Sequence, residues 1–341
     1  ISKLFESVPL KNVTLYFELN FLDAAFTEEL IQYFKAQEVD VHYRIDLIQR
    51  LTKDGNWFHS MEKDHQILET LVSKYPKSQL LGIDTSGYQN AGANTIQQLA
   101  YGLAHANEYL NHFKSHFENY PPTLTFTIAT GSNYFFEIAK IRALRWLVAS
   151  LADAYDFDIE CHILVIPSKR NKTIYDYNVN MLRTTTECMS AVLGGANAVM
   201  NVPYDTLYHK SNEFGERISR NQLLILKSEG YFDWVSNPVD GSFFVEKLTE
   251  ELAEKALVLF KNIEEAGGFL KNLKDGTIQR KISESAEKEQ QWFDKGKLIL
   301  VGSNKYPNSE DRIKEELELY PFLKHKPRKT IIQPVIEKRL A

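Results

Sequence analysis

The sequence has little cysteine, no long apolar run and no excess of positive charge. Its two cysteines, Cys161 and Cys188, lie far apart, so they form neither a zinc-binding spacing nor a disulfide framework. No run approaches the roughly 20 apolar residues that a membrane-spanning helix needs. The formal net charge is −5 and no basic stripe alternates with aromatics, so we expect no binding to nucleic acid. With no signal peptide, the low cysteine content indicates the reducing cytoplasm.

Common catalytic motifs are missing as well. The sequence has no GxGxxG after a strand, no Walker A loop and no HExxH. His112 and His116 are four residues apart near a predicted helix end, but no third metal ligand accompanies them. Asp40-Val41-His42 begins like the Asp-x-His-x-x-Gly signature of cobalamin-binding domains, but Ile45 stands where the glycine belongs. Asp84, at a strand end, fits either a catalytic carboxylate or a loop cap.

Eight short apolar runs alternate with helical stretches along the chain. Most are continuously apolar and rich in Val, Ile, Leu and Phe, which is typical of parallel strands buried on both faces. The runs cover residues 13–19, 39–45, 79–84, 123–129, 159–166, 197–202, 232–237 and 298–303. Helices are predicted over 95–113, 133–150 and 248–266, with one more before the last run. Strict alternation of eight strands with helices predicts a (β/α)8 TIM-type barrel, with a doubly wound sheet as the alternative.

Several long blocks are similar to methylmalonyl-CoA mutase and its acyl-CoA mutase relatives. They include "SGYQNAGANTIQQLAYGLAHANEYL", "NVNMLRTTTECMSAVLGGANAV" and "NPVDGSFFVEKLTEELAEKALVLFKNIEEAGGF", and they follow family order from about residue 80 to 308. The first 80 residues match more weakly. The resemblance implies a barrel that holds a CoA thioester along its axis, beside a separate domain that binds adenosylcobalamin. The assembled enzyme then interconverts methylmalonyl-CoA and succinyl-CoA.

Residues that contact substrate in the family are changed in this chain. The family's Ser-Gly-Tyr-His becomes Ser86-Gly87-Tyr88-Gln89 in a shorter loop, so the histidine that polarises the thioester carbonyl is replaced. An arginine and a serine that contact CoA become Thr123 and Thr125, and a neutral hydroxyl cannot replace a bidentate guanidinium. Met200 replaces another histidine. The resemblance therefore implies a degenerate site at Gln89, Thr123, Thr125 and Met200, with no catalytic residue left.

This pattern is most similar to the small, non-catalytic subunit of the heterodimeric bacterial mutases. The resemblance implies an isomerase component that supports a large catalytic subunit, with adenosylcobalamin held by the large subunit and no cofactor or metal bound by this chain. The alternative is a catalytic acyl-CoA mutase barrel truncated before its cobalamin domain, so whether this chain is itself an enzyme stays open. A catalytic barrel needs an open axis, which a small subunit can fill with Leu164, Ile166 and Met200.

The resemblance also predicts the domain organisation. Residues 1–315 are expected to form the barrel. The basic segment 316–341 is expected to form an extended arm or linker towards a region like the cobalamin domain. The helices at 133–150 and 178–193 are candidates for the partner interface because they are apolar beyond one face, although core burial explains that composition equally well.

Overall fold

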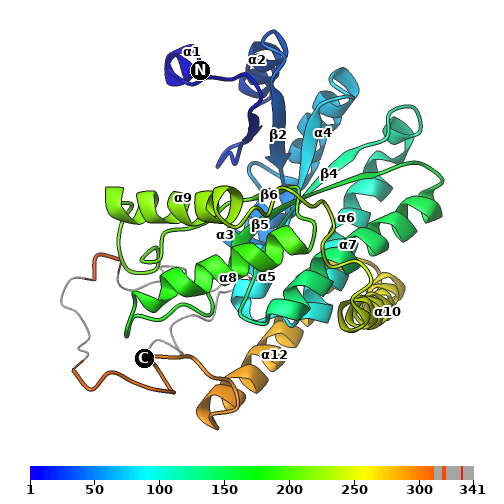
Figure 1. Cartoon of the computed structure of the whole chain (residues 1–341). Helices are drawn as coiled ribbons and strands as arrows, with labels where there is room; N and C mark the ends of the chain where they lie inside the picture. The colour runs from blue at the N-terminus through cyan, green and yellow to red at the C-terminus, as the bar shows by residue number, and fades with distance from the viewer. Residues whose placement is uncertain (311–316, 320–331, 333–341) are drawn as a thin grey trace.

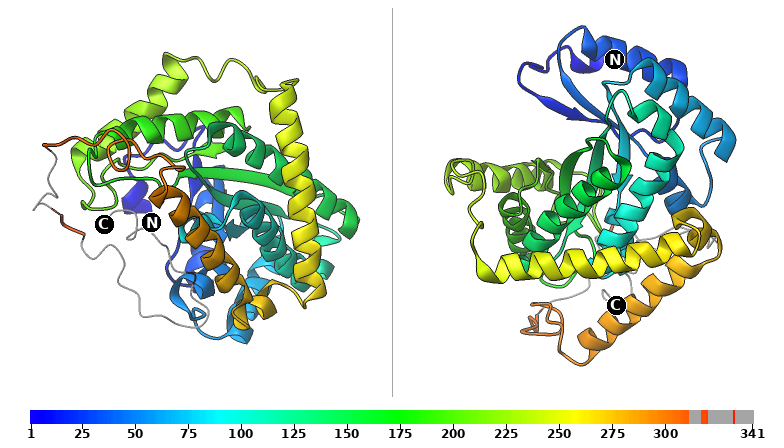
Figure 2. Two further views of the ribbon diagram at one scale, coloured as in Figure 1. Left: turned by 90° about the horizontal axis from the view of Figure 1, so that it is seen from below. Right: turned by 90° about the vertical axis from the view of Figure 1, so that its right-hand side faces the viewer.

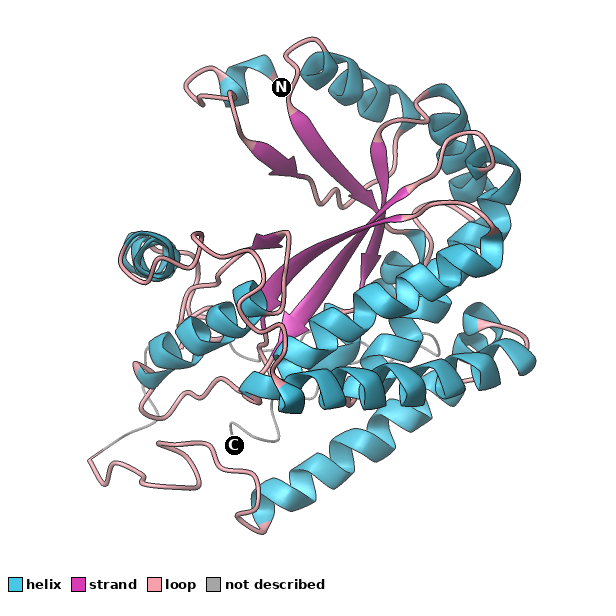
Figure 3. Cartoon of the chain, turned by 45° about the vertical axis from the view of Figure 1, so that its right-hand side comes forward, coloured by secondary structure: helices cyan, strands magenta, loops and turns pink. Residues whose placement is uncertain are grey.

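A curled sheet of six parallel strands forms the centre of the computed structural model, which describes residues 1–310, 317–319 and 332 (Figure 1). The strands are β1 (Thr14–Tyr16), β2 (Asp40–Ile45), β3 (Gln79–Asp84), β4 (Thr123–Thr130), β5 (Glu160–Pro167) and β6 (Ala198–Val199). They lie side by side in chain order. Because this order never reverses, the sheet is wound like a barrel wall, and the doubly wound alternative is wrong. The predicted α/β class is confirmed, and the described strands form half of a TIM-type barrel (Figure 3).

Helices precede and follow the strands, and several of them pack against the convex face of the sheet. They are α1 (Ser2–Phe5), α2 (Ala24–Lys35), α3 (Leu47–Asp54), α4 (Met61–Lys74), α5 (Ser86–Ala91), α6 (Thr95–Phe117), α7 (Tyr134–Tyr155), α8 (Val179–Leu193), α9 (Glu213–Ser228), α10 (Phe243–Glu265), α11 (Phe269–Lys274) and α12 (Thr277–Asp294). The long helix α10 crosses α6 and α7 as an outer layer (Figure 2). Within the described residues, none of these helices is both long and apolar enough to cross a membrane.

The two faces of β4 show how the sheet separates its two environments. Leu124, Phe126 and Ile128 belong to the hydrophobic core under the helices and are at most 4% exposed. Their neighbours Thr125 and Thr127 point to the opposite, concave face because side chains alternate along a strand. The concave face of the half-barrel is therefore lined with polar groups at this strand, although it is buried.

Local sequence signals explain where the helices begin and end. Asn94 caps α6 through a reciprocal capping box with Gln97, and Gly55 closes α3 in the left-handed conformation. The helix predicted at 248–266 starts earlier than expected, at Phe243. Thr249, expected near its start, lies in its interior, where its hydroxyl donates to the carbonyl of Val245 at 2.8 Å.

Two of the eight predicted strands are wrong. The run 232–237 forms turns at the surface, where Trp234 is 76% and Val235 58% exposed. The run 298–303 makes only an isolated bridge, between Val301 and Lys305. Its backbone groups are satisfied locally, since the side chain of Asn304 accepts from the Leu300 amide and donates to the Leu298 carbonyl. Neither run pairs with a strand of the sheet, so neither extends it. An apolar composition alone does not make a segment a strand.

The predicted linker at 316–341 lies outside the described residues, except for residues 317–319 and 332. The amides of Glu318 and Leu319 donate to the Tyr208 carbonyl, at 2.8 and 3.0 Å. The amide of Ile332 donates to the Thr52 carbonyl at 2.9 Å, and its side chain is buried in the main core. These contacts place two points of the segment against the barrel.

Candidate functional site

Gln89 lies in α5, directly beyond the carboxyl end of β3. Its side-chain oxygen accepts a hydrogen bond from the Ser168 hydroxyl at 2.8 Å, and that hydroxyl in turn accepts from the Arg170 amide at 3.0 Å. The adjacent Asn90 accepts from the Lys169 amide at 3.0 Å. Gln89 and Asn90 together hold the loop that follows β5. The oxygen of the Gln89 amide is thus engaged in an internal contact at the strand end where barrel enzymes place their chemistry.

Asp84 ends β3 and acts as a loop cap. One carboxylate oxygen accepts from the Ser86 amide at 2.9 Å and from the Ser86 hydroxyl at 2.6 Å, while the other accepts from Gln49 at 3.1 Å. Burial raises the pKa of Asp84, and the hydrogen bonds from Ser86 and the charge of Arg44 act against that shift. Of the two roles predicted for Asp84, the cap is the one observed.

A second buried network surrounds Asp46, the cap of α3. One of its carboxylate oxygens accepts from His105 Nε2 and from the Tyr109 hydroxyl, each at 2.9 Å. The other accepts from the Asp84 amide at 2.8 Å. His105 Nδ1 is hydrogen-bonded to the Tyr88 hydroxyl at 3.0 Å. Tyr88, which precedes Gln89 in the loop, is therefore engaged in an internal contact. The network joins the ends of β2 and β3 to α6 and stabilises the rim.

Three aromatic rings fill part of the concave face. Tyr16, His42 and His162 come from β1, β2 and β5. The Tyr16 and His42 rings are stacked with centroids 4.9 Å apart, and the His42 and His162 centroids are 3.8 Å apart. The Tyr16 hydroxyl is hydrogen-bonded to His162 Nε2 at 2.7 Å, and His42 Nδ1 to the Thr125 hydroxyl at 2.7 Å. The cluster ties four strands together across the inside of the half-barrel.

The environment of these rings favours their neutral forms. Burial, reinforced by the neighbouring His162, lowers the pKa of His42 from 6.5 to about 4, although Asp40 and Glu160 act in the opposite direction. Burial also lowers the pKa of His162 and raises that of Tyr16 to about 12. At neutral pH the cluster therefore contributes hydrogen bonds and stacking but no charge.

The four predicted site residues do not meet in one cavity. Thr125 is completely buried against His42, and Thr123, at the start of β4, donates its hydroxyl hydrogen to Glu160 at 2.7 Å. Both lie towards the amino half of the strand, whereas Gln89 lies beyond the carboxyl end of β3. Met200, just after β6, is 49% exposed, so about half of its surface stays in solvent instead of filling the barrel interior as expected.

The residues that do fill the interior differ from those predicted. Leu164 is 3% exposed, as expected, but the large rings of Tyr16, His42 and His162 were not foreseen in this role. A signal was available in the sequence. In "VDVHYRI" and "ECHILVI" a histidine stands two residues after an acid within an apolar run. In each strand, this spacing places the acid and the histidine on the same face.

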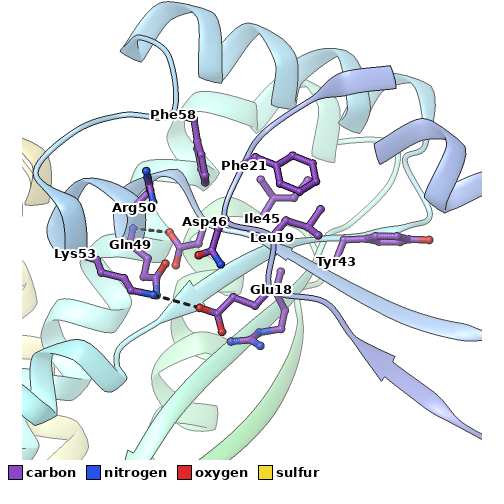
Figure 4. Close-up of a pocket in the computed structure, with 12 residues that line it drawn as sticks. Glu18, Leu19, Phe21, Tyr43, Ile45, Asp46, Gln49, Arg50, Lys53 and Phe58 are labelled. Atoms are coloured by element: carbon purple, nitrogen blue, oxygen red, sulfur yellow. Dashed lines mark hydrogen bonds and ion pairs between the residues drawn. The ribbon is translucent and has the colours of Figure 1, made fainter. Parts of the chain in front are cut away.

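Two cavities near the strand ends are small. One of about 30 Å³ lies between the ends of β1 and β2 and α3, with Lys53 and Glu18 facing each other at 3.5 Å beside it (Figure 4). Another, of about 10 Å³, is lined by Arg44 and Thr127 among others. The Thr127 hydroxyl is buried without a hydrogen-bond partner. Spaces of this size hold one or two water molecules, whereas ligand pockets measure about 300 to 1,000 Å³.

A larger cleft, of about 540 Å³, lies outside the sheet at the amino ends of β2 and β3. Lys35 and Lys74 border it from the last turns of α2 and α4. Lysines in that position offset the negative ends of helix dipoles, and Lys74 is already paired with Glu28 at 2.6 Å. The cleft therefore lies at the opposite end of the sheet from Gln89, and its two lysines are explained by ordinary helix-end chemistry.

His42 does not fit a ligand of the cobalamin that the resemblance assigns to the large subunit. A histidine that binds cobalt has to present a ring nitrogen to a large corrin ring. His42, in the segment that begins like the cobalamin signature, is 1% exposed inside the half-barrel and uses Nδ1 on Thr125. Among the described residues no group of three His, Cys, Asp or Glu side chains is placed to hold a metal ion.

Comparison with known proteins identifies the family. The family model for methylmalonyl-CoA mutase matches residues 1–337. The chain is 37% identical over 243 residues to the methylmalonyl-CoA mutase small subunit of Porphyromonas gingivalis, covering 68% of this chain and 39% of that protein. It is 35% identical over 254 residues to the methylmalonyl-CoA mutase of Cereibacter sphaeroides, covering 72% and 36%. It is 33% identical over 246 residues to the small subunit of Streptomyces virginiae, covering 70% and 40%.

The chain therefore spans about two fifths of the length of these curated relatives. The relatives include proteins named as small subunits and proteins named simply as mutases, so the names agree on the family and differ on the subunit. The family model extends over nearly the whole sequence, and the strands wind in the order of a TIM-type barrel. On these grounds the chain belongs to the methylmalonyl-CoA mutase family.

Proposed function

We propose that this chain is the barrel of a mutase small subunit, which does not catalyse the reaction and supports a large catalytic subunit. The assembled enzyme would interconvert methylmalonyl-CoA and succinyl-CoA in the cytoplasm, with adenosylcobalamin held by the large subunit. Residues 1–315 would form the barrel, and 316–341 a linker towards a region like the cobalamin domain. Two relatives carry the name small subunit, which supports this assignment.

The observation that carries the proposal is the ring cluster on the concave face. In a barrel that threads a CoA thioester along its axis, this face has to stay open. Here Tyr16, His42 and His162 pack against one another across it, with Thr125 fully buried beneath them. A pantetheine arm could enter only if these rings left their contacts, and three ring contacts and two hydrogen bonds would be lost.

The polar groups near the predicted site also disfavour CoA. Thr123 stands where the family has an arginine, and its hydroxyl donates to Glu160. A carboxylate beside this position repels a phosphate, whereas a guanidinium would bind it in a bidentate manner. Gln89 is neutral and its oxygen is bound to Ser168, so it supplies no cation to a thioester carbonyl. The proposed degenerate site therefore comprises Gln89, Thr123, Thr125 and Met200.

The proposal is tested by incubating the purified full chain with adenosylcobalamin and methylmalonyl-CoA and measuring succinyl-CoA by chromatography. We expect no turnover by this chain alone, and no heat of binding with CoA in calorimetry. Turnover is expected when the large subunit of the same organism is added and the two proteins co-elute in gel filtration. Turnover by this chain without a large subunit would favour the alternative, a catalytic acyl-CoA mutase barrel.

A further inference from the structure

Three histidines and a glutamate lie together where α4 packs beside α6 (Figure 1). His65 and Glu69 are four residues apart on α4, and His112 and His116 are four residues apart on α6. Residues with this spacing share one face of a helix. The pair His112 and His116 had no third metal ligand near it in the sequence, and the packing of the two helices brings two further candidates to it. We call the four residues the α4–α6 cluster.

Contacts between the two helices show that the cluster is compact. The ring centroids of His65 and His112 are 4.7 Å apart, and His116 Nε2 lies 3.9 Å from a carboxylate oxygen of Glu69. Burial lowers the pKa of His112, the charges of His65 and His116 reinforce that shift, and Glu69 opposes it. His112 is therefore close enough to respond to all three other members. The uncharged imidazole that this environment favours is the form that binds metal ions.

His65 is oriented by its second ring nitrogen. Its Nδ1 is hydrogen-bonded to the Met61 carbonyl oxygen at 2.7 Å. Because a carbonyl only accepts, Nδ1 carries the hydrogen, and Nε2 of the neutral ring keeps a free lone pair. The Trp57 ring, with its centroid 5.5 Å away, packs against the imidazole from another side. Histidines that bind metals commonly donate their other ring nitrogen to a carbonyl or carboxylate in this way.

The spacing in the cluster is close to that of a tetrahedral metal site. Ligand atoms that each lie 2.0–2.1 Å from one ion are about 3.3 Å from one another, and the contact between His116 and Glu69 is about 0.6 Å longer than that. In their present rotamers no three of these groups are placed to hold an ion. His112 and Glu69 are exposed, so their side chains are free to turn into other staggered rotamers. The set is therefore completed by side-chain rotation, with the backbones of α4 and α6 unchanged.

We propose that the α4–α6 cluster binds a divalent transition-metal ion such as zinc, through the imidazoles of His65, His112 and His116 and the carboxylate of Glu69. Three neutral imidazoles and one carboxylate are ligands that this ion prefers. The inference goes beyond the proposed function, which assigns no metal to this chain. All four ligands belong to α4 and α6 and none to a strand end, so the ion has a structural role in joining these two helices.

The test titrates zinc chloride into the full chain after treatment with a chelator, by isothermal calorimetry. We expect one ion per chain, and a higher unfolding temperature when zinc is present. His112→Ala and His116→Ala should each raise Kd about tenfold or more, because each removes a ligand. His209→Ala is the matched control and should leave Kd unchanged. The His209 side chain is 24% exposed, like that of His116, and it also faces a carboxylate, that of Asp205.

A second measurement repeats the titration at about pH 5, where protonated imidazoles no longer bind the ion, and the affinity should fall. Circular dichroism checks that each variant is folded. If zinc produces neither heat nor a shift in unfolding temperature, the inference is overturned. It is likewise overturned if zinc binds His112→Ala and His116→Ala as tightly as the unmodified chain, because the ion then lies elsewhere. Neither result bears on the proposed function, which is tested by mutase turnover.

Discussion

The rings of His42 and His162 lie 3.8 Å apart, centroid to centroid, although β2 and β5 are not neighbours in the sheet. Two strands, β3 and β4, separate them. In a flat sheet, strands spaced by roughly 4.8 Å would place β2 and β5 roughly 14 Å apart. The two imidazoles meet because the sheet curls, so their contact is a direct consequence of the half-barrel. It also fills part of the concave face, which supports the proposed non-catalytic role.

Tyr16→Phe is expected to lower the free energy of unfolding by about 1 kcal/mol, because it removes the hydrogen bond to His162 and leaves a part-buried ring nitrogen without a partner. Urea denaturation followed by circular dichroism measures the change. Tyr306→Phe is the matched control, since Tyr306 is 74% exposed, and no change is expected there. Equal effects of the two substitutions would show that the hydrogen bond between Tyr16 and His162 adds nothing to stability.

Acid should destabilise the protein through His42. Its pKa is about 4 in the folded chain and 6.5 as the ordinary value, so the unfolded chain takes up this proton first as pH falls. The stability that His42 contributes is complete above pH 6.5 and is lost progressively as pH falls towards 4, by at most about 3 kcal/mol. His42→Gln should flatten the stability curve over this range. An unchanged slope in that variant would contradict the assignment.

The buried ion pair between Lys172 and Glu187 should respond very differently to single and double substitution. The ammonium lies 2.7 Å from a carboxylate oxygen, and each side chain is 1% exposed. Lys172→Met should lower the free energy of unfolding by about 3–5 kcal/mol, because it leaves the Glu187 carboxylate buried without its cation. Lys172→Met combined with Glu187→Leu should recover most of that loss.

The matched control for this pair is Lys255→Met, which breaks the exposed contact between Lys255 and Glu251. This substitution should lower the free energy of unfolding by less than about 1 kcal/mol, because exposed ion pairs contribute little to stability. Chemical denaturation of the four proteins measures all the differences. A double variant as unstable as Lys172→Met would show that the rest of the surrounding network, including Asn171, needs the charge of Glu187.

Gln89→His restores the side chain that the family carries at this position, and we expect it to create no mutase activity. The concave face remains filled by Tyr16, His42 and His162, and Thr123 still stands where the family has an arginine. The assay is succinyl-CoA formation with added adenosylcobalamin, with the unmodified chain as control. Detectable turnover would mean that the substrate reaches Gln89 despite the ring cluster.

The sequence predicted some parts of the fold well. All six observed strands fall within or overlap predicted runs, because buried parallel strands are apolar throughout. The two runs that failed, at 232–237 and 298–303, are apolar for other reasons. Trp234 and Val235 are exposed in the loop before α10, and the other run folds around the side chain of Asn304. Apolar composition cannot distinguish these cases, since each depends on what lies next to the segment in space.

By itself the sequence determined the alternation of strands and helices, the family resemblance and the replacements at Gln89 and Thr123. These are properties of local pattern and of residue identity, and they need no knowledge of distant contacts. Only the tertiary structure decided that Tyr16, His42 and His162 pack together across the concave face, that Gln89 binds Ser168, and that Met200 stays about half exposed. The physical reason is the curl of the sheet and the course of its loops, which bring together residues far apart in the chain.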